Sequence, residues 1–166
     1  MSAEYSQLVK FKEAFDEACK ERENDIEKAV MEMAEYLIAT VTPLTPVYAP
    51  KEISGHTYHA YEKGSKRIGG DLRKHWAEDN QNLTVRHVGK DYVVDVVNKS
   101  EYALFVEEGH KQHVGQRFPV FIDGKLRMVK HKKNYVKGQH FLRKAETQLR
   151  RKAPTILNAH LKDFMR

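Results

Sequence analysis

The sequence predicts an α+β fold with a long N-terminal helix, an antiparallel β-sheet that contains a hairpin, and a C-terminal helix packed on the sheet. Three observations predict it: helical spacing of apolar residues near the N-terminus, β-prone runs around Asp123-Gly124, and two apolar helical faces after Gly138. We expect a single domain that consists of a helix at 5–42, an extended arm at 48–69, a sheet region at 70–137 and a C-terminal helix at 138–166.

The N-terminal helix is predicted by steps of three, four and seven residues between apolar positions. These positions are Leu8, Phe11, Phe15, Cys19, Ile26, Ala29, Val30, Met33 and Leu37. A helix of this length would span about 50 Å, so we expect a break or bend at Asn24-Asp25. The prolines of Thr42-Pro43-Leu44-Thr45-Pro46 should end it. The single cysteine lies on the apolar face, where we expect a buried and inert thiol.

The middle of the chain alternates between an irregular stretch and β-prone runs. Residues 48–70 mix glycine, lysine and aromatic residues without a clear period, which predicts a long exposed arm. Strands are expected at Leu83–Val88 and Tyr92–Val97, and the valine-rich second run is typical of a central strand. Phe118–Ile122 and Lys125–Val129 flank Asp123-Gly124, which is a strong hairpin signal.

The C-terminal helix carries two apolar faces. Phe141, Leu142, Ala145 and Leu149 form the first face, and Ile156, Leu157, Leu161 and Phe164 form the second. Because Pro154 lies between them, we expect it to kink the helix or to separate its two parts.

Composition is that of a soluble globular protein. Of the 166 residues, 40% are apolar and 31% are charged, which gives a lean core that partner subunits could complete. No apolar run approaches the roughly 20 residues of a membrane span, so no membrane association is expected. The N-terminal residues lack the apolar core of a signal peptide, and one cysteine excludes an intrachain disulfide. Synthesis in a reducing cytoplasm is the simplest interpretation.

Charge is divided unevenly along the chain, whose net charge is +6. Residues 1–40 hold five Lys/Arg and ten Asp/Glu, residues 41–110 hold nine and ten, and residues 111–166 hold fifteen and three. The basic end could face a polyanion such as nucleic acid. It could instead dock on the acidic end of a neighbouring copy, because head-to-tail contacts between identical chains build rings.

Whether the sequence favours an enzyme depends on how residues 98–110, NKSEYALFVEEGH, are interpreted. Ser100 is expected to cap a short helix in which Tyr102, Phe105 and Val106 share one face. Gly109 then stands where a helix ends in the left-handed conformation. The stretch is therefore explained as strand, turn, short helix and glycine stop, without catalysis.

Catalytic alternatives find weaker support in the sequence. His110 and His113, with Glu107 or Glu108, could ligate a metal and form a hydrolase centre, but the chain has neither His-Glu-x-x-His nor a cysteine pair. It also lacks a Gly-x-Ser-x-Gly elbow and a phosphate loop. We therefore expect no catalytic residue, no bound metal and no cofactor.

A second class of function remains open in the basic segment 111–152. Its lysines and arginines are interleaved with Tyr135, His140 and Phe141, so they could contact the phosphates of a nucleic acid. Charge runs on helices are usually solvated faces, and this one could also dock on acidic protein.

Four fragments of the sequence, taken in order, resemble a known family. They are Thr45-Pro46-Val47, Gly70-Asp71-Leu72-Arg73-Lys74-His75-Trp76, the segment from Val96 to His110, and Tyr135-Val136-Lys137-Gly138-Gln139-His140-Phe141-Leu142 with the residues that follow to Glu146. They resemble the small tail-component proteins of tailed bacteriophages and phage-like elements, which complete the tail or join it to the head at the neck. The chain departs from the family pattern in carrying the 48–69 arm, Gly69 in place of threonine, and His75 where serine is common.

The resemblance implies a non-enzymatic protein of the virion tail or neck that assembles in the host bacterial cytoplasm. It implies a homo-oligomer, expected to be a hexameric ring, which contacts other neck or tail proteins such as the tail terminator, tail tube and connector. Gly70 and Gly109 would set turns, Leu72 and Trp76 would anchor an amphipathic element, and Arg73 could pair with Glu107. The further residues expected to be structural or to lie in an interface are Tyr102, Phe105, His110, Gly138 and Phe141.

Overall fold

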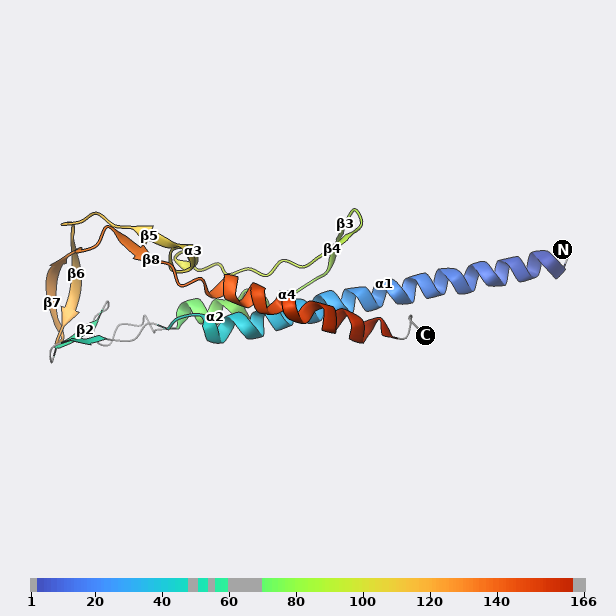
Figure 1. The fold of residues 1–166 in the computed structure, drawn as a ribbon, viewed down its shortest axis with the longest axis horizontal. Coiled ribbons are helices and arrows are strands. Elements are labelled where there is room, and N and C mark those ends of the chain that lie inside the picture. The colour runs from blue at the N-terminus through green and yellow to red at the C-terminus, as the bar shows by residue number, and fades with distance from the viewer. Residues whose placement is uncertain (1–2, 48–50, 54–55, 60–69, 163–166) are drawn as a thin grey trace. The chain divides into compact units, whose positions relative to one another are not determined.

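The computed structural model describes residues 3–47, 51–53, 56–59 and 70–162 (Figure 1). The elements are α1 (Ala3–Leu44), β1 (Lys51–Ile53), β2 (His56–His59), α2 (Asp71–Glu78), β3 (Arg86–Val88), β4 (Asp91–Val93), α3 (Ala103–Glu108), β5 (Gly109–Lys111), β6 (Arg117–Ile122), β7 (Lys125–Lys130), β8 (Tyr135–Lys137) and α4 (Phe141–His160). The chain divides into two compact units: unit 1 holds residues 1–37, 82–96 and 147–166, and unit 2 holds residues 38–81 and 97–146. The predicted α+β class is confirmed, whereas the single-domain expectation stays a prediction.

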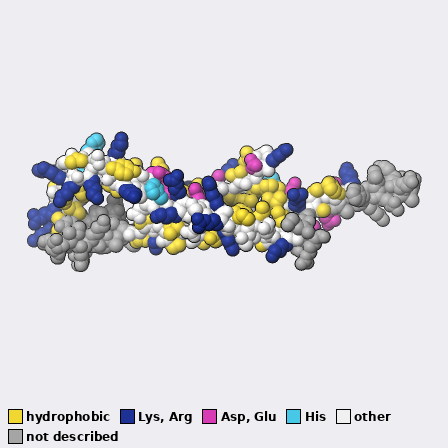
Figure 2. Space-filling view, viewed as in Figure 1, with side chains coloured by type: hydrophobic (Ala, Val, Ile, Leu, Met, Phe, Trp, Pro, Cys, Tyr) yellow, Lys and Arg dark blue, Asp and Glu magenta, His cyan; other side chains and the backbone are white. Residues whose placement is uncertain are grey.

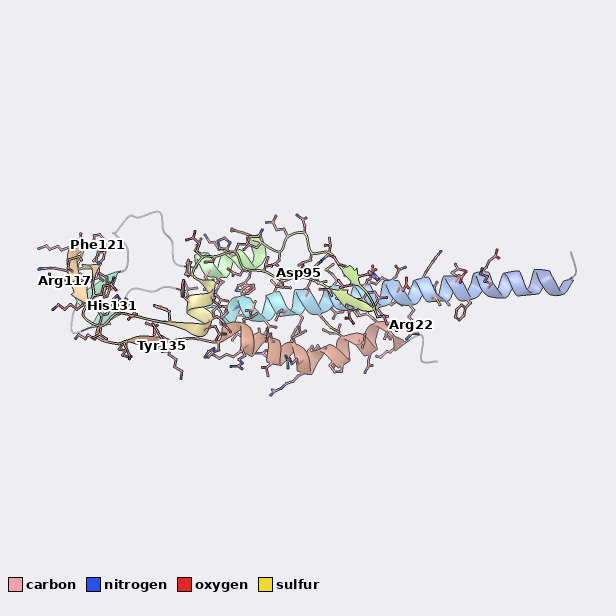
Figure 3. The ribbon with its side chains drawn as sticks, turned by 90° about the horizontal axis from the view of Figure 1, so that it is seen from above. Arg22, Asp95, Arg117, Phe121, His131 and Tyr135 are labelled. Atoms are coloured by element: carbon pink, nitrogen blue, oxygen red, sulfur yellow. The ribbon has the colours of Figure 1, made fainter. Side chains whose placement is uncertain are left out.

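Unit 1 is built on α1, with the last part of α4 beside it (Figures 1 and 3). Ala29, Ala34 and Ile156 are buried there, and small alanine side chains let neighbouring elements come close. Two exposed contacts tie α1 to the other elements of the unit: Glu27 to His87 of β3 at 2.8 Å, and Glu32 to His160 of α4 at 2.7 Å. In unit 1 the terminal helix is therefore bonded to α1, although the sequence placed it on the sheet.

Of the break or bend expected at Asn24-Asp25, the break is wrong, because the helix runs without interruption from Ala3 to Leu44, whereas the bend stays a prediction. No glycine or proline precedes Pro43 within it, and Asp25 accepts a hydrogen bond from Lys28 one turn later, at 2.9 Å. The expected stop at the prolines is confirmed. The expected burial of Cys19 is wrong, since its side chain is exposed.

The single sheet that the sequence predicted is replaced by three small antiparallel sheets. Their strand orders are β1-β2-β6-β7, β3-β4 and β5-β8. Strands β1 and β2 fall inside the 48–69 segment that was expected to be an arm, whereas 48–50, 54–55 and 60–69 lie outside the described residues. The Asp123-Gly124 hairpin is confirmed between β6 and β7, with φ of 50° and 77° at the two turn residues. Both angles are positive, as the tight hairpin turn that suits twisted strands requires.

The expected central strand Tyr92–Val97 is also wrong, because β4 ends at Val93 and pairs only with β3. The physical reason lies in unit 2, where the Asn80 side chain forms hydrogen bonds with both backbone polar groups of Val97. Its Oδ1 accepts from the Val97 N–H at 2.9 Å, and its Nδ2 donates to the Val97 carbonyl at 2.7 Å. A side-chain amide thus takes the bonds that a neighbouring strand would have made.

Helix α4 is continuous from Phe141 to His160 and contains Pro154. The proline therefore does not divide it into two helices, as the sequence had allowed. Phe141 and Ala145 are buried in unit 2, and Ile156 is buried in unit 1. The first predicted apolar face thus contributes Phe141 and Ala145 to unit 2, and the second contributes Ile156 to unit 1. Leu157 of the second face is exposed, and Phe164 lies outside the described residues.

Candidate functional site

The four sequence fragments that define the resemblance come together inside unit 2 and form one cluster. We call it the motif cluster, and it comprises Thr45, Gly70, Leu72, Arg73, Trp76, Tyr102, Glu107, Gly109, Gly138 and Phe141. Five of its members, Thr45, Leu72, Trp76, Glu107 and Phe141, are buried, with exposed fractions between 0% and 7%.

The first and second fragments meet at the C-terminal end of α1. The Arg73 guanidinium donates to the carbonyl of Thr45 at 2.7 and 3.2 Å and to that of Pro43 at 3.4 Å. Trp76 Nε1 donates to the Thr45 hydroxyl at 2.8 Å, and that hydroxyl donates to the Val41 carbonyl at 2.8 Å. The last carbonyls of a helix lack partners within the helix, so Arg73 satisfies groups that the chain leaves open there.

The second and third fragments are joined through Tyr102. Its hydroxyl accepts from the Leu72 N–H at 3.1 Å and donates to Asp71 at 3.2 Å, while Asn98 Nδ2 donates to the Leu72 carbonyl at 2.9 Å. Burial, which disfavours the phenolate, is the main reason that the pKa of Tyr102 is raised. The tyrosine is therefore a neutral hydrogen-bonding link at neutral pH.

The second and fourth fragments pack through aromatic rings. Trp76 and Phe141 meet edge to face with their centroids 6.3 Å apart, and both are almost fully buried. Leu72 is buried one turn before Trp76 on α2, so the two residues expected to anchor an amphipathic element lie on one buried helix face. This geometry favours a packed core over a binding pocket.

The third and fourth fragments are joined by a buried carboxylate. The two Glu107 oxygens accept from the N–H groups of Leu142 and Arg143, at 3.0 and 3.1 Å, in the first turn of α4. A carboxylate at this position satisfies open donors and faces the positive end of the helix dipole. The Arg73–Glu107 pair that the sequence allowed is not formed, because Arg73 binds the C-terminal end of α1 and Glu107 binds the first turn of α4.

Two glycines let the backbones of these fragments touch. A Cβ on Gly138 would lie 2.3 Å from the Glu107 carbonyl oxygen, and one on Gly109 would lie 2.3 Å from that of Val136. Gly109 ends α3 with φ of 84° and ψ of 175°, which is a positive φ but not the left-handed helical conformation that the sequence suggested. The predicted cap at Ser100 is wrong too, because α3 begins at Ala103 with Tyr102 before it and no side-chain cap.

Sequence reasoning missed several residues that hold the cluster. Asp79 accepts from the Lys99 N–H at 2.7 Å and contacts His75 Nδ1 at 3.0 Å. The bond from Lys99 is the main cause that lowers the pKa of Asp79. Asn80 also donates to the Trp76 carbonyl at 2.8 Å. A run of short polar residues directly after α2 is the signal that could have identified them, since such residues favour helix ends.

The remaining predicted site residues lie at the edge of the cluster. Phe105 is 53% exposed, and its ring meets that of His110 edge to face with centroids 5.7 Å apart. Gly70 has φ of 104° directly before α2, where a turn was expected, and a Cβ added there would lie 3.7 Å from the Val47 side chain of the first fragment.

The alternative metal site at His110 and His113, which the sequence supported only weakly, does not form a ligand group among the described residues. Within the described residues, the group with ligand atoms close enough to share an ion consists of Glu107, Glu108 and His140, whose atoms lie within 4.8 Å of one another. Both oxygens of Glu107 already accept from α4, which accounts for this buried carboxylate without a metal. Arg73, Glu107 and the Thr45 hydroxyl thus bind backbone groups, and Trp76 binds that same hydroxyl, an arrangement that stabilises a fold.

The part of the basic segment before α4 lies on strands β5 to β8 of unit 2 and on the loops between them. Between residues 109 and 137 there are eight lysines and arginines and one acidic residue, Asp123. All eight are exposed, and Figure 2 shows many of them as dark blue side chains over these strands. The exposed basic residues are Lys111, Arg117, Lys125, Arg127, Lys130, Lys132, Lys133 and Lys137.

Comparison with known families gives a match. The family described as "Bacteriophage HK97-gp10, putative tail-component" matches residues 9–109, well over half of the chain. No curated protein and no solved structure matches the sequence. In the described part of the chain, no helix combines the length and the hydropathy that a membrane span requires. The matched range includes the first three fragments, and the structure adds that the fourth packs against them.

Proposed function

The chain belongs to the HK97-gp10-like family of bacteriophage tail components, and from this premise we propose that it is a structural protein that completes the tail at the head–tail connector. It acts by fitting against other proteins and carries out no reaction. Its expected place is the neck or tail region of the virion, after assembly in the cytoplasm of the host bacterium.

One observation carries this proposal: polar side chains of the four fragments form hydrogen bonds that fix the ends of helices. Arg73 and Trp76 secure the end of α1, and Glu107 secures the start of α4. A catalytic site would need polar groups aimed at a space that a substrate could enter. A motif cluster of this kind instead fixes the shape of a component that other proteins must fit.

The uneven charge supports self-association as the mode of assembly. Copies with an acidic N-terminal part and a basic C-terminal part attract one another head to tail, and such contacts close into rings when the rotation allows. We propose a homo-hexameric ring that matches the six-fold symmetry of a tail. Its other partners would be the connector, the tail terminator and the tail tube.

Light scattering of the purified protein at low and high salt tests the ring. A mass that corresponds to several copies, and that falls as salt screens the charges, is the expected result. A monomer at both salt concentrations, even in concentrated solution, contradicts the ring.

The exposed basic residues of unit 2 favour a second candidate, binding of nucleic acid. Phosphate contacts made by Lys130, Lys132 and Lys133 would give a salt-dependent mobility shift with random-sequence duplex DNA. Replacing these three lysines by alanine should abolish that shift. A chain that binds duplex DNA and never associates with itself would favour this candidate over the ring.

A further inference from the structure

Between residues 12 and 24, the described side chains on the apolar stripe of α1 are uncovered within unit 1. Every described side chain from residue 12 to residue 24 is exposed, and Phe15 is 60% exposed. We call residues 12–24 the overhang. Phe15 and Cys19 are one turn apart and lie on the same stripe as Ile26 and Ala29, where the helix becomes covered. Figures 1 and 3 show no other described element of unit 1 beside the helix on the N-terminal side of Arg22.

A helix segment whose apolar face is exposed is stabilised when another protein surface packs against that face. Segments of this length are marginal in water unless an amphipathic face is packed. The overhang carries five acidic and three basic residues, so a surface that covers it should be apolar in the centre and positively charged.

The β6–β7 hairpin in unit 2 has such a surface. Strand register puts Pro119 opposite Met128 and Phe121 opposite Leu126 on one face, with Arg117 opposite Lys130 at the end of that face. We call these six residues the hairpin face. Leu126 is 59% and Met128 is 58% exposed. On the opposite face Phe118 is half-buried, with the His131 ring stacked on it at 4.3 Å, so the two faces differ.

The overhang and the hairpin face have opposite charges, and both combine apolar with charged residues over a similar length. The hairpin face lies within the segment that has eight basic residues and one acidic residue, whereas the overhang is acidic. Thirteen helical residues span about 20 Å, at 1.5 Å per residue. Six strand residues also span about 20 Å.

We propose that the overhang of one copy docks on the hairpin face of a neighbouring copy. This inference rests on the proposed self-association and names the surfaces that make it. A second copy fits better than nucleic acid, because phosphates would pair with the basic residues but would leave Leu126 and Met128 without apolar contact. An acidic helix with an apolar stripe satisfies both kinds of residue.

The lone cysteine offers a direct test. Cys19 is exposed on the overhang, so a photo-crosslinking maleimide can be attached there without mutation. Labelled protein is mixed with isotopically heavy protein that carries no label, and the products are analysed by mass spectrometry. We expect cross-links from Cys19 of the light chain to residues 117–130 of the heavy chain. Cross-links confined to the same chain, or to other segments of the neighbouring copy, overturn the proposal.

Substitutions provide a second readout, with matched controls. Phe15→Glu should weaken self-association by about tenfold or more, as loss of a buried aromatic side chain implies. Lys20→Gln makes the same change in charge on another side of the helix and should have little effect. Leu126→Glu should weaken association as Phe15→Glu does, whereas Leu104→Glu, at a position that is 69% exposed on α3, should not. Circular dichroism verifies that each variant is folded.

The outcomes separate this inference from the proposed function. If the unmodified chain associates but Phe15→Glu and Leu126→Glu associate equally well, the docking surfaces are wrong and the ring proposal stands. If the unmodified chain is monomeric throughout, both proposals are overturned. If Leu126→Glu leaves association intact while the basic hairpin binds random-sequence duplex DNA, the assignment of a second copy to this face is overturned.

Discussion

The motif cluster of unit 2 and the overhang of unit 1 use the same residue types in opposite ways. In the motif cluster, Arg73 and Glu107 each bind backbone groups at a helix end, and Trp76 is 3% exposed. In the overhang, the charged residues are exposed and Phe15 is 60% exposed. The family match includes the overhang and the first three fragments of the motif cluster, so a shared sequence pattern does not by itself separate residues that hold the fold from residues that make contacts.

This difference indicates which region should determine the stability of the chain and which should determine its association with other copies. Satisfied buried polar groups make a unit rigid, and their loss is costly. Exposed charged and apolar residues contribute little to the stability of a single chain and become important when a partner covers them. Substitutions in the motif cluster should therefore change unfolding, and substitutions in the overhang should change association.

The largest effect is expected for Gly138→Ala. The added Cβ would lie 2.3 Å from the carbonyl oxygen of Glu107, and both backbones belong to the cluster, so neither can yield easily. We expect a loss of about 3 to 5 kcal/mol in the free energy of unfolding, measured by denaturant titration. Gly89→Ala, in the β3–β4 turn where a Cβ meets nothing within 4 Å, should lose only about 1 kcal/mol. Equal losses would show that the cluster is not the rigid region.

Removing the charge of Glu107 should come next. In Glu107→Gln one acceptor becomes a donor that faces the N–H groups of α4, so we expect a loss of about 1.5 to 3 kcal/mol. Glu32→Gln, which affects the exposed contact with His160, should cost less than about 1 kcal/mol. Thermal unfolding of both variants checks the difference, and a Glu32 effect as large as that of Glu107 would contradict it.

Trp76→Phe should have a smaller effect. The phenyl ring keeps most of the contact with Phe141 but cannot donate to the Thr45 hydroxyl. We expect a loss of about 1 to 2 kcal/mol by denaturant titration, since a buried hydroxyl loses its donor and a small space opens. Val88→Ala, at a position that is 55% exposed in β3, serves as the surface control and should change stability by about 0.5 kcal/mol or less.

The smallest effect concerns acid unfolding. Because the hydrogen bond from Lys99 lowers the pKa of Asp79 below its ordinary value of 3.8, the ionised carboxyl stabilises the folded chain. That contribution is present above the ordinary pKa and is lost as the pH falls through the lower folded value. Asp79→Asn should therefore flatten the dependence of melting temperature on pH in the acidic range around and below that ordinary value. An unchanged slope would show that Asp79 does not contribute.

Local pattern was sufficient for several features of the fold. The apolar spacing predicted α1 and α4, Asp123-Gly124 predicted the β6–β7 hairpin, and Leu72 with Trp76 predicted the buried face of α2. Each of these depends on residues that are close in the sequence, which a periodicity or a turn rule can detect.

Long-range side-chain contacts account for the errors. Arg73 and Glu107 have opposite charges, so pairing them was reasonable, but each binds a helix end that only the tertiary structure brings near. The valines after β4 have strong β-propensity, yet the Asn80 side chain forms the hydrogen bonds with the Val97 backbone that a neighbouring strand would have made. Cys19 lies on an apolar stripe, but nothing described in unit 1 covers it. Periodicity indicates which face is apolar and does not indicate where along a helix that face is covered.

One measurement tests the central claim most directly: unfolding temperature and particle mass, recorded together for Trp76→Phe and Phe15→Glu. The account predicts that Trp76→Phe lowers the unfolding temperature and still associates at permissive temperature, whereas Phe15→Glu associates less and has an unchanged unfolding temperature as a monomer. If Phe15→Glu unfolds like Trp76→Phe, or if Trp76→Phe alone abolishes association while folded, the separation between holding the fold and making contacts is contradicted.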